Sequence, residues 1–151
     1  MTRASTSTHT FRNDPVPTTD PLLDPARLTA IRELDLDGAS PQAALENLNS
    51  LAQRLLGVPV SVVSIVSDRR HFNVSQGARS GDAPPQQEFP LSHSFCQHVA
   101  RSGDALIVSD AREHPDVSSN LAVRDHNVIA YAGLPLRLNS GEVVGAFCAV
   151  D

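Results

Sequence analysis

The chain has 151 residues, 40% of them hydrophobic, and a formal net charge of −5 at pH 7. This length predicts a single domain that is large enough to bury a core. The charges are spread along the chain, which argues against a nucleic-acid-binding face, and no apolar run approaches the roughly 20 residues needed to cross a membrane. We therefore expect neither nucleic acid nor a membrane as a partner.

The N-terminus and the cysteine content together predict a cytoplasmic protein. The first residues lack the apolar centre of a secretory signal. Two cysteines, Cys96 and Cys148, are too few for a disulfide framework, which fits a reducing compartment. Free cysteine is among the most buried residue types, so we expect both to pack as small hydrophobes in the core.

Residues 1–23 are rich in Thr, Ser, Pro and Asp, so we predict a disordered arm there and a folded domain over 24–151. Asp24-Pro25 combines the acceptor and the proline that are typical of a helix start. Ser40-Pro41 repeats that signal, and Gly57 ends the second helix. The apolar residues of this second helix are Leu45, Leu48, Leu51, Ala52, Leu55 and Leu56.

From residue 58 the pattern changes to strands. Residues 58–67 are rich in β-branched side chains, which predicts a central strand covered on both faces. A turn at 68–70 leads into a second strand at 71–77, and the two form a hairpin. Residues 78–90 contain Gly and Pro clusters and are predicted to be a loop.

The stretch from Leu91 to Gly103 predicts a helix that begins near Ser92 or Ser94 and ends at Gly103. Phe95 and Val99 form one apolar stripe on it.

A strand at 105–109 follows the helix, and then comes an irregular segment with one short helical turn at 121–125. Two final strands are joined by Asn139-Ser140-Gly141, a good hairpin signal. This order predicts an α+β fold, with helices grouped on one face of an antiparallel sheet.

Three phrases of the second half occur in a distinctive order: SFCQH from Ser94, VSDAREHP from Val108, and YAGLPL from Tyr131. With the helices and strands before them, they resemble the GAF domain, a small sensory module of bacterial signalling proteins. The resemblance runs from about Leu22 to Asp151. It implies a GAF-like antiparallel central sheet of five to six strands with helices packed on it.

The resemblance also implies a function. GAF domains of this kind are non-enzymatic regulatory or sensory domains of signal-transduction proteins, which bind a small molecule or transmit a signal to an output domain in cis or in trans. Members usually continue past the last strand with a further helix. This chain stops at Asp151, so we expect the sequence to be part of a longer protein.

In the family the ligand pocket lies between the sheet and the irregular segments, which points to five lining residues here. They are Phe95, His98, Asp110, Asn120 and Tyr131. The resemblance does not identify the ligand or any cofactor.

An alternative is a domain that binds no ligand and forms a homodimer through the first helix. The face that would meet the second copy carries Leu28, Ile31 and Leu34.

Other functions of GAF domains depend on residues that this chain has only in part. Covalent bilin attachment uses a cysteine directly followed by histidine, and here Gln97 intervenes; the cyclic-nucleotide signature includes a lysine, and the chain has none. Two alternatives are less favoured. A haem could use His98 or His126 as axial ligand. A methionine sulfoxide reductase works through cysteines, and this chain has only two. Helical spacing separates His93, Cys96 and His98, so no metal site is predicted.

Overall fold

The structure is a computed structural model that describes residues 19–34, 39–77 and 88–151. Of the predicted arm, residues 1–18 lie outside this described part. The residues after them are ordered: a 3-10 helix, η1 (Pro21–Leu23), buries Leu22 completely. Asp20 accepts a hydrogen bond from the backbone N–H of Leu22 and is paired with Arg101. The last residues of the predicted arm are therefore part of the folded domain, because Leu22 and the Asp20–Arg101 pair anchor them.

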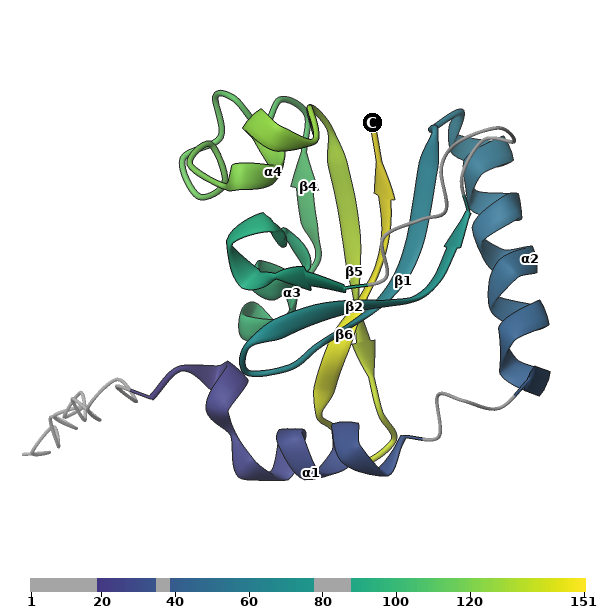
Figure 1. The fold of residues 1–151 in the computed structure, drawn as a ribbon, viewed down its shortest axis with the longest axis vertical. Helices are drawn as coiled ribbons and strands as arrows, with labels where there is room; N and C mark the ends of the chain where they lie inside the picture. Colours follow the sequence, from purple (N-terminus) through teal and green to yellow (C-terminus); the bar gives the residue numbers. More distant parts are fainter. Residues whose placement is uncertain (1–18, 35–38, 78–87) are drawn as a thin grey trace, which may run out of the picture.

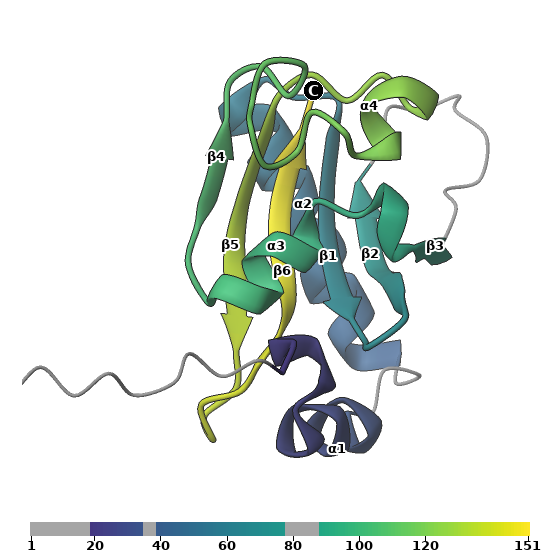
Figure 2. The same ribbon diagram turned by 90° about the vertical axis from the view of Figure 1, so that its left-hand side faces the viewer.

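Six strands of the described part form one antiparallel sheet in the order β3-β2-β1-β6-β5-β4 (Figures 1 and 2), which confirms the predicted α+β, GAF-like architecture. The strands are β1 (Val60–Val66), β2 (Arg70–Gly77), β3 (Glu88–Pro90), β4 (Leu106–Val108), β5 (Tyr131–Arg137) and β6 (Val143–Val150). β1 and β6 are central, and β1 is buried on both faces as its β-branched run predicts. β3 falls at the end of the stretch predicted as a loop, of which residues 78–87 lie outside the described part.

The helices cover both faces of the sheet, so the prediction that they group on one face is wrong. α2 (Ala39–Leu56) packs on one face, while α3 (Cys96–Ser102) and α4 (Leu121–Asp125) lie on the other, and α1 (Pro25–Glu33) sits at one end (Figures 1 and 2). The physical reason is that β1 and β6 carry apolar residues on both faces, and each face needs cover. No helix within the described ranges is long and apolar enough to cross a membrane.

Local sequence signals account for where the helices begin and end. The Asp24 side chain accepts from the backbone N–H of Ala26 at the start of α1, as predicted. The predicted helix after Leu91 is split into a 3-10 helix, η2 (Leu91–His93), and α3, which ends at Gly103 with a positive φ of 72°. The Ser94 hydroxyl joins the two pieces by accepting from the backbone N–H of Gln97.

A β-bulge in β2 decides which of its polar side chains reach which face. Val63 of β1 pairs with Ser75, but the next residue, Ser64, pairs with Asn73, so Val74 is an extra residue. Because paired residues share a face, Ser75 points toward α2, while Asn73 points toward α3. The bulge therefore places polar residues of β2 on both sides of the sheet.

The contact between α2 and the sheet is more polar than the leucines of this helix suggest. Asn49 is completely buried; its Nδ2 donates to Ser75 Oγ at 2.8 Å, and its Oδ1 accepts from Ser61 Oγ at 2.9 Å. Four leucines of the helix are instead 43–75% exposed, namely Leu48, Leu51, Leu55 and Leu56. The leucine content of α2 therefore does not mark the face that meets the sheet.

Candidate functional site

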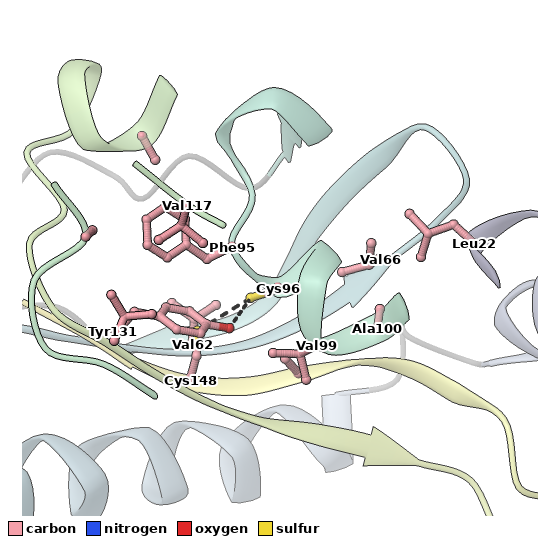
Figure 3. Close-up of a cluster of buried hydrophobic side chains, with 14 residues drawn as sticks. Leu22, Val62, Val66, Phe95, Cys96, Val99, Ala100, Val117, Tyr131 and Cys148 are labelled. Atoms are coloured by element: carbon pink, nitrogen blue, oxygen red, sulfur yellow. Dashed lines mark hydrogen bonds between the residues drawn. The ribbon is translucent and has the colours of Figure 1, made fainter. Parts of the chain in front are cut away.

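Four side chains meet in the middle of the α3 side of the sheet (Figure 3). Phe95 and Cys96 lie at the start of α3, Tyr131 begins β5, and Cys148 lies in β6. The two Sγ atoms are 3.7 Å apart, and the hydroxyl of Tyr131 donates to Cys96 Sγ at 3.2 Å. The rings of Phe95 and Tyr131 pack with centroids 5.3 Å apart. All four side chains are buried, so they belong to the core on the α3 side.

The hydrogen bonds at this centre make Cys96 the more acidic of the two thiols. The hydrogen bond between Cys96 and Cys148 has the largest effect and, together with the charge of His71 and the hydroxyls of Ser64 and Tyr131, it outweighs burial and lowers the pKa of Cys96 to about 6. The same contact, followed by burial, raises the pKa of Cys148 well above its usual value. The pair therefore favours a negative charge on Cys96 and a proton on Cys148.

A buried histidine links β2 to the entry of α3. His71 Nδ1 lies 2.8 Å from Ser94 Oγ, and its Nε2 lies 2.8 Å from Asn73 Oδ1. Both ring nitrogens are thus engaged, which fixes the orientation of the ring. Since Ser94 also caps the first turn of α3, the histidine holds the segment that carries Cys96.

A row of rings continues from His71 toward α4. Phe89 of β3 packs against His71 and against His126, with centroids 5.7 Å apart in each case, and His126 packs against His93 at 5.5 Å. His93 Nε2 contacts Asp125 Oδ2 at 3.0 Å. Ring packing and one polar contact thus join β3, η2 and α4 along the edge of this side.

Three of the five predicted site residues lie close together. Phe95 and Tyr131 are in ring contact, as described above. Asn120 caps α4 by accepting from the backbone N–H of Ala122, and its Nδ2 donates to the carbonyl of Ser94 at 3.1 Å. Asn120 therefore ties the irregular crossing segment to the residue next to Phe95.

The side chains of the other two predicted residues, His98 and Asp110, interact with charged neighbours. His98 is half-buried on α3, where burial and then the charge of Arg101 lower its pKa; Asp116 of the crossing segment opposes this. Asp110 is paired with Arg112, which lowers the pKa of that carboxyl to about 2. Its Oδ1 also accepts from the backbone N–H of Arg112, which is a turn-forming contact.

The sequence predicts that both cysteines are core residues, which the structure confirms. It does not predict their contact or the role of His71. Cys96 and Cys148 are separated by 52 positions, and no local pattern predicts their pairing. His71 pairs with Val66 directly beside the turn between β1 and β2, and this pairing places it on the α3 side. Only the strand pairing, which is a tertiary feature, brings these groups together.

His93 lies in η2, while Cys96 and His98 lie in α3, so the three do not share one helix as the prediction assumed. His93 contacts Asp125 and Cys96 contacts Cys148. In the ranges that the structure describes, no group of three or more His, Cys, Asp or Glu residues is placed to hold a metal ion.

Comparison with protein families gives a match to the GAF domain over residues 40–151. Comparison with curated proteins gives no match. The family match covers α2, the whole sheet, α3 and α4.

Several solved structures share the fold at low sequence identity. The GAF domain of the Acinetobacter phosphoenolpyruvate-protein phosphotransferase has a TM-score of 0.57 and 12% identity, covering 83% of this chain and 75% of that one. Free methionine-R-sulfoxide reductase from Neisseria meningitidis, solved with its substrate, has 0.55 and 15%, covering 84% and 70%. The blue-light absorbing form of the Thermosynechococcus elongatus PixJ GAF domain has 0.56 and 19%, covering 73% and 68%. These similarities show the fold of this chain. Its chemistry has to be inferred from its own residues, because one fold can host many functions.

Proposed function

The chain belongs to the GAF domain family, and from that premise we propose that it is a non-enzymatic regulatory domain of a cytoplasmic bacterial signalling protein. In this proposal a small molecule binds on the α3 side of the sheet, and the resulting structural change is transmitted to an output domain in cis or in trans. Sensory or regulatory roles are typical of the family, and a phosphotransferase and a light-absorbing protein are among the proteins whose GAF domains share this fold.

The observation that carries the proposal is the way in which the α3 side is covered. Apart from α3, its cover is a short helix and an irregular crossing segment. The buried side chains that this layer adds to the core around Phe95 and Tyr131 are small or β-branched, namely Ala111, Val117 and Ala122, and single polar contacts such as Asn120 to Ser94 supplement them. Such a layer has less apolar area to expose on opening than a long helix packed on a sheet. A small molecule that displaces this layer would meet Phe95 and Tyr131 beneath it.

We assign the binding side to five residues on this basis. Phe95 and Tyr131 form the apolar floor, Asn120 supplies amide groups at the edge, and His98 and Asp110 border the crossing segment. A mostly apolar site with a few polar groups is the usual composition of a small-molecule pocket.

The proposal is tested by ligand-dependent stability of the full chain. Thermal unfolding is measured with free methionine-R-sulfoxide, cyclic GMP and haemin as separate probes. A probe at 100 times its dissociation constant stabilises the folded state by about 2.7 kcal/mol, and we expect Asn120→Ala to lose this effect. Asn139→Ala, in the turn between β5 and β6, is the matched control and keeps it. A probe that stabilises Asn120→Ala as strongly as the unchanged chain contradicts the assigned site.

The non-enzymatic part of the proposal has its own test, because one structural neighbour is a methionine-R-sulfoxide reductase. Here both cysteines are buried under α3, and hydrogen bonding already engages them with each other. We expect no sustained turnover of free methionine-R-sulfoxide in the presence of a dithiol reductant. Turnover that disappears in Cys96→Ser would make the chain an enzyme and overturn the proposal.

The exposed leucines of α2 favour self-association as a second candidate function. On α1, Leu28, Ile31 and Leu34 are partly buried against the rest of the domain, so that helix is not a free dimerisation face. The exposed leucines of α2 are the better candidate, with Leu55 at 75% exposure. Sedimentation over a range of protein concentrations tests this: a dimer that Leu55→Glu dissociates supports it, and a monomer at all concentrations rejects it.

A further inference from the structure

The sulfur pair under α3 has a chemistry that the regulatory proposal does not use. Cys96 and Cys148 are both free thiols, 1% and 3% exposed, with their Sγ atoms 3.7 Å apart. Two thiols at this distance can be joined as a disulfide when an oxidant accepts their electrons.

We propose that Cys96 and Cys148 form a redox-active dithiol, which a hydroperoxide such as hydrogen peroxide oxidises to an intramolecular disulfide. The site needs no other ligand, so this inference does not depend on the small-molecule proposal. It gives the domain an oxidant as an input signal.

The reaction takes place in two steps. The thiolate of Cys96 attacks one oxygen of the peroxide, the O–O bond breaks, and a sulfenic acid forms on Cys96 while the departing hydroxide takes up a proton to become water. The sulfur of Cys148 then loses its proton and attacks the sulfur of Cys96, and the S–O bond breaks to release a second water. One peroxide is reduced and two thiols are oxidised.

The surroundings of Cys96 suit it to the first step and those of Cys148 to the second. The thiolate is the nucleophile in such reactions, and Cys96 accepts hydrogen bonds that stabilise its charge. Cys148, which keeps its proton, lies directly beside it as the resolving thiol. The hydroxyl of Tyr131, 3.2 Å from Cys96 Sγ, is a positioning group that holds the charge on the attacking sulfur.

Closing the disulfide moves α3. A disulfide has an S–S distance of about 2.05 Å, so the two sulfurs must approach by about 1.6 Å. β6 is hydrogen-bonded to β1 on one side and to β5 on the other, and it cannot shift alone. α3 is a short helix on the surface of the sheet, so it takes up the movement and carries Phe95 with it. Because both thiols are buried, the peroxide reaches them only when α3 opens, which makes the reaction slower than that of an exposed thiolate.

The test starts from the reduced full chain, which is treated with hydrogen peroxide under native conditions. We expect the intact mass to fall by about 2 Da, the mass of two hydrogens, and the thiols counted after denaturation to disappear. The product stays monomeric in a non-reducing gel and regains both thiols with dithiothreitol. Retention of both thiols at peroxide levels that oxidise a free thiol, or disulfides formed only between chains, overturns the proposal.

Variants identify the role of each sulfur. Cys148→Ala is expected to stop at a sulfenic acid on Cys96 that dimedone traps, while Cys96→Ala leaves Cys148 unreactive. Equal trapping at both positions contradicts the assignment of nucleophile and resolving thiol. Circular dichroism confirms that each variant is folded.

Tyr131→Phe gives a further test that keeps both thiols and the ring packing. Loss of the hydroxyl raises the pKa of Cys96, so the pH at which oxidation becomes fast shifts upward. An unchanged pH profile refutes the positioning role of Tyr131. Hydrogen exchange of residues 94–103 should differ between the reduced and oxidised chain, and identical exchange refutes the movement of α3.

Discussion

Replacing Arg27 tests the contact that fixes α1 to the sheet. Its side chain is 4% exposed, and the guanidinium donates to three backbone carbonyls: Val143 at the start of β6, Leu22 in η1 and Val66 at the end of β1. A buried acceptor left without its donor costs about 1–3 kcal/mol. Three acceptors lose their donor in Arg27→Ala, while the burial cost of the guanidinium, which lowers the pKa of Arg27, is relieved. We expect a net loss of about 3 kcal/mol.

The loss is measured as the free energy of unfolding in urea. Arg32→Ala on the same helix is the matched control, because Arg32 is exposed and donates a side-chain hydrogen bond to Thr29 Oγ1 at 3.1 Å. The control should change stability by less than about 0.5 kcal/mol. Arg27→Lys should fall between the two, since an ammonium cannot reproduce the planar fork of donors. If Arg27→Ala costs no more than Arg32→Ala, the guanidinium does not hold α1 in place and the reasoning is refuted.

Three further changes have defined outcomes. Gly145→Ala would place a Cβ atom 1.9 Å from the carbonyl oxygen of Ser64 in the neighbouring strand, so we expect a cost of about 3 kcal/mol in urea unfolding; a cost under about 1 kcal/mol contradicts this close approach. Asn49→Ala leaves two buried serine hydroxyls without their partner and should lower the free energy of unfolding by about 2 kcal/mol. Asn47→Ala, on the exposed face of α2, is the control and should leave stability nearly unchanged. The lowered pKa of His98 means that the unfolded chain takes up a proton before the folded one, so stability falls as the pH drops below about 6.5, and His98→Gln should flatten this part of the pH dependence. An unaltered slope in that variant assigns the effect to another group.

The sequence predicts those parts of the fold that depend on local chemistry. Asp24-Pro25 begins α1, Gly103 ends α3, and the short turn at 121–125 is α4. In each case the signal and the structure lie within the same few residues, so composition and spacing are sufficient. The turn between β5 and β6 at Asn139-Ser140-Gly141 belongs to the same class.

The features that escaped prediction depend on contacts between distant segments. From the sequence alone, Arg27 is expected to be an exposed helix residue. In the structure its guanidinium donates to carbonyls at the start of β6 and the end of β1. β3 is three residues long and forms only because β2 offers a free edge. His71 reaches α3 because it pairs with Val66 of β1, and Cys148 reaches Cys96 because β6 lies at the centre of the sheet. Strand pairing decides which face of the sheet His71 and Cys148 occupy, since a shift of one residue would move each side chain to the other face.

Those same long-range contacts connect the sulfur pair to the N-terminal segment. Cys96 begins α3, and Arg101 near its other end forms two hydrogen bonds, of 2.9 and 3.0 Å, with Asp20. Asp20 caps η1, and the carbonyl of Leu22 in η1 accepts from Arg27, whose other donors reach the two central strands. When α3 moves toward β6, Arg101 must move with it, because a helix this short shifts as a rigid unit. The Asp20 pair is therefore a contact through which a movement of α3 would reach η1.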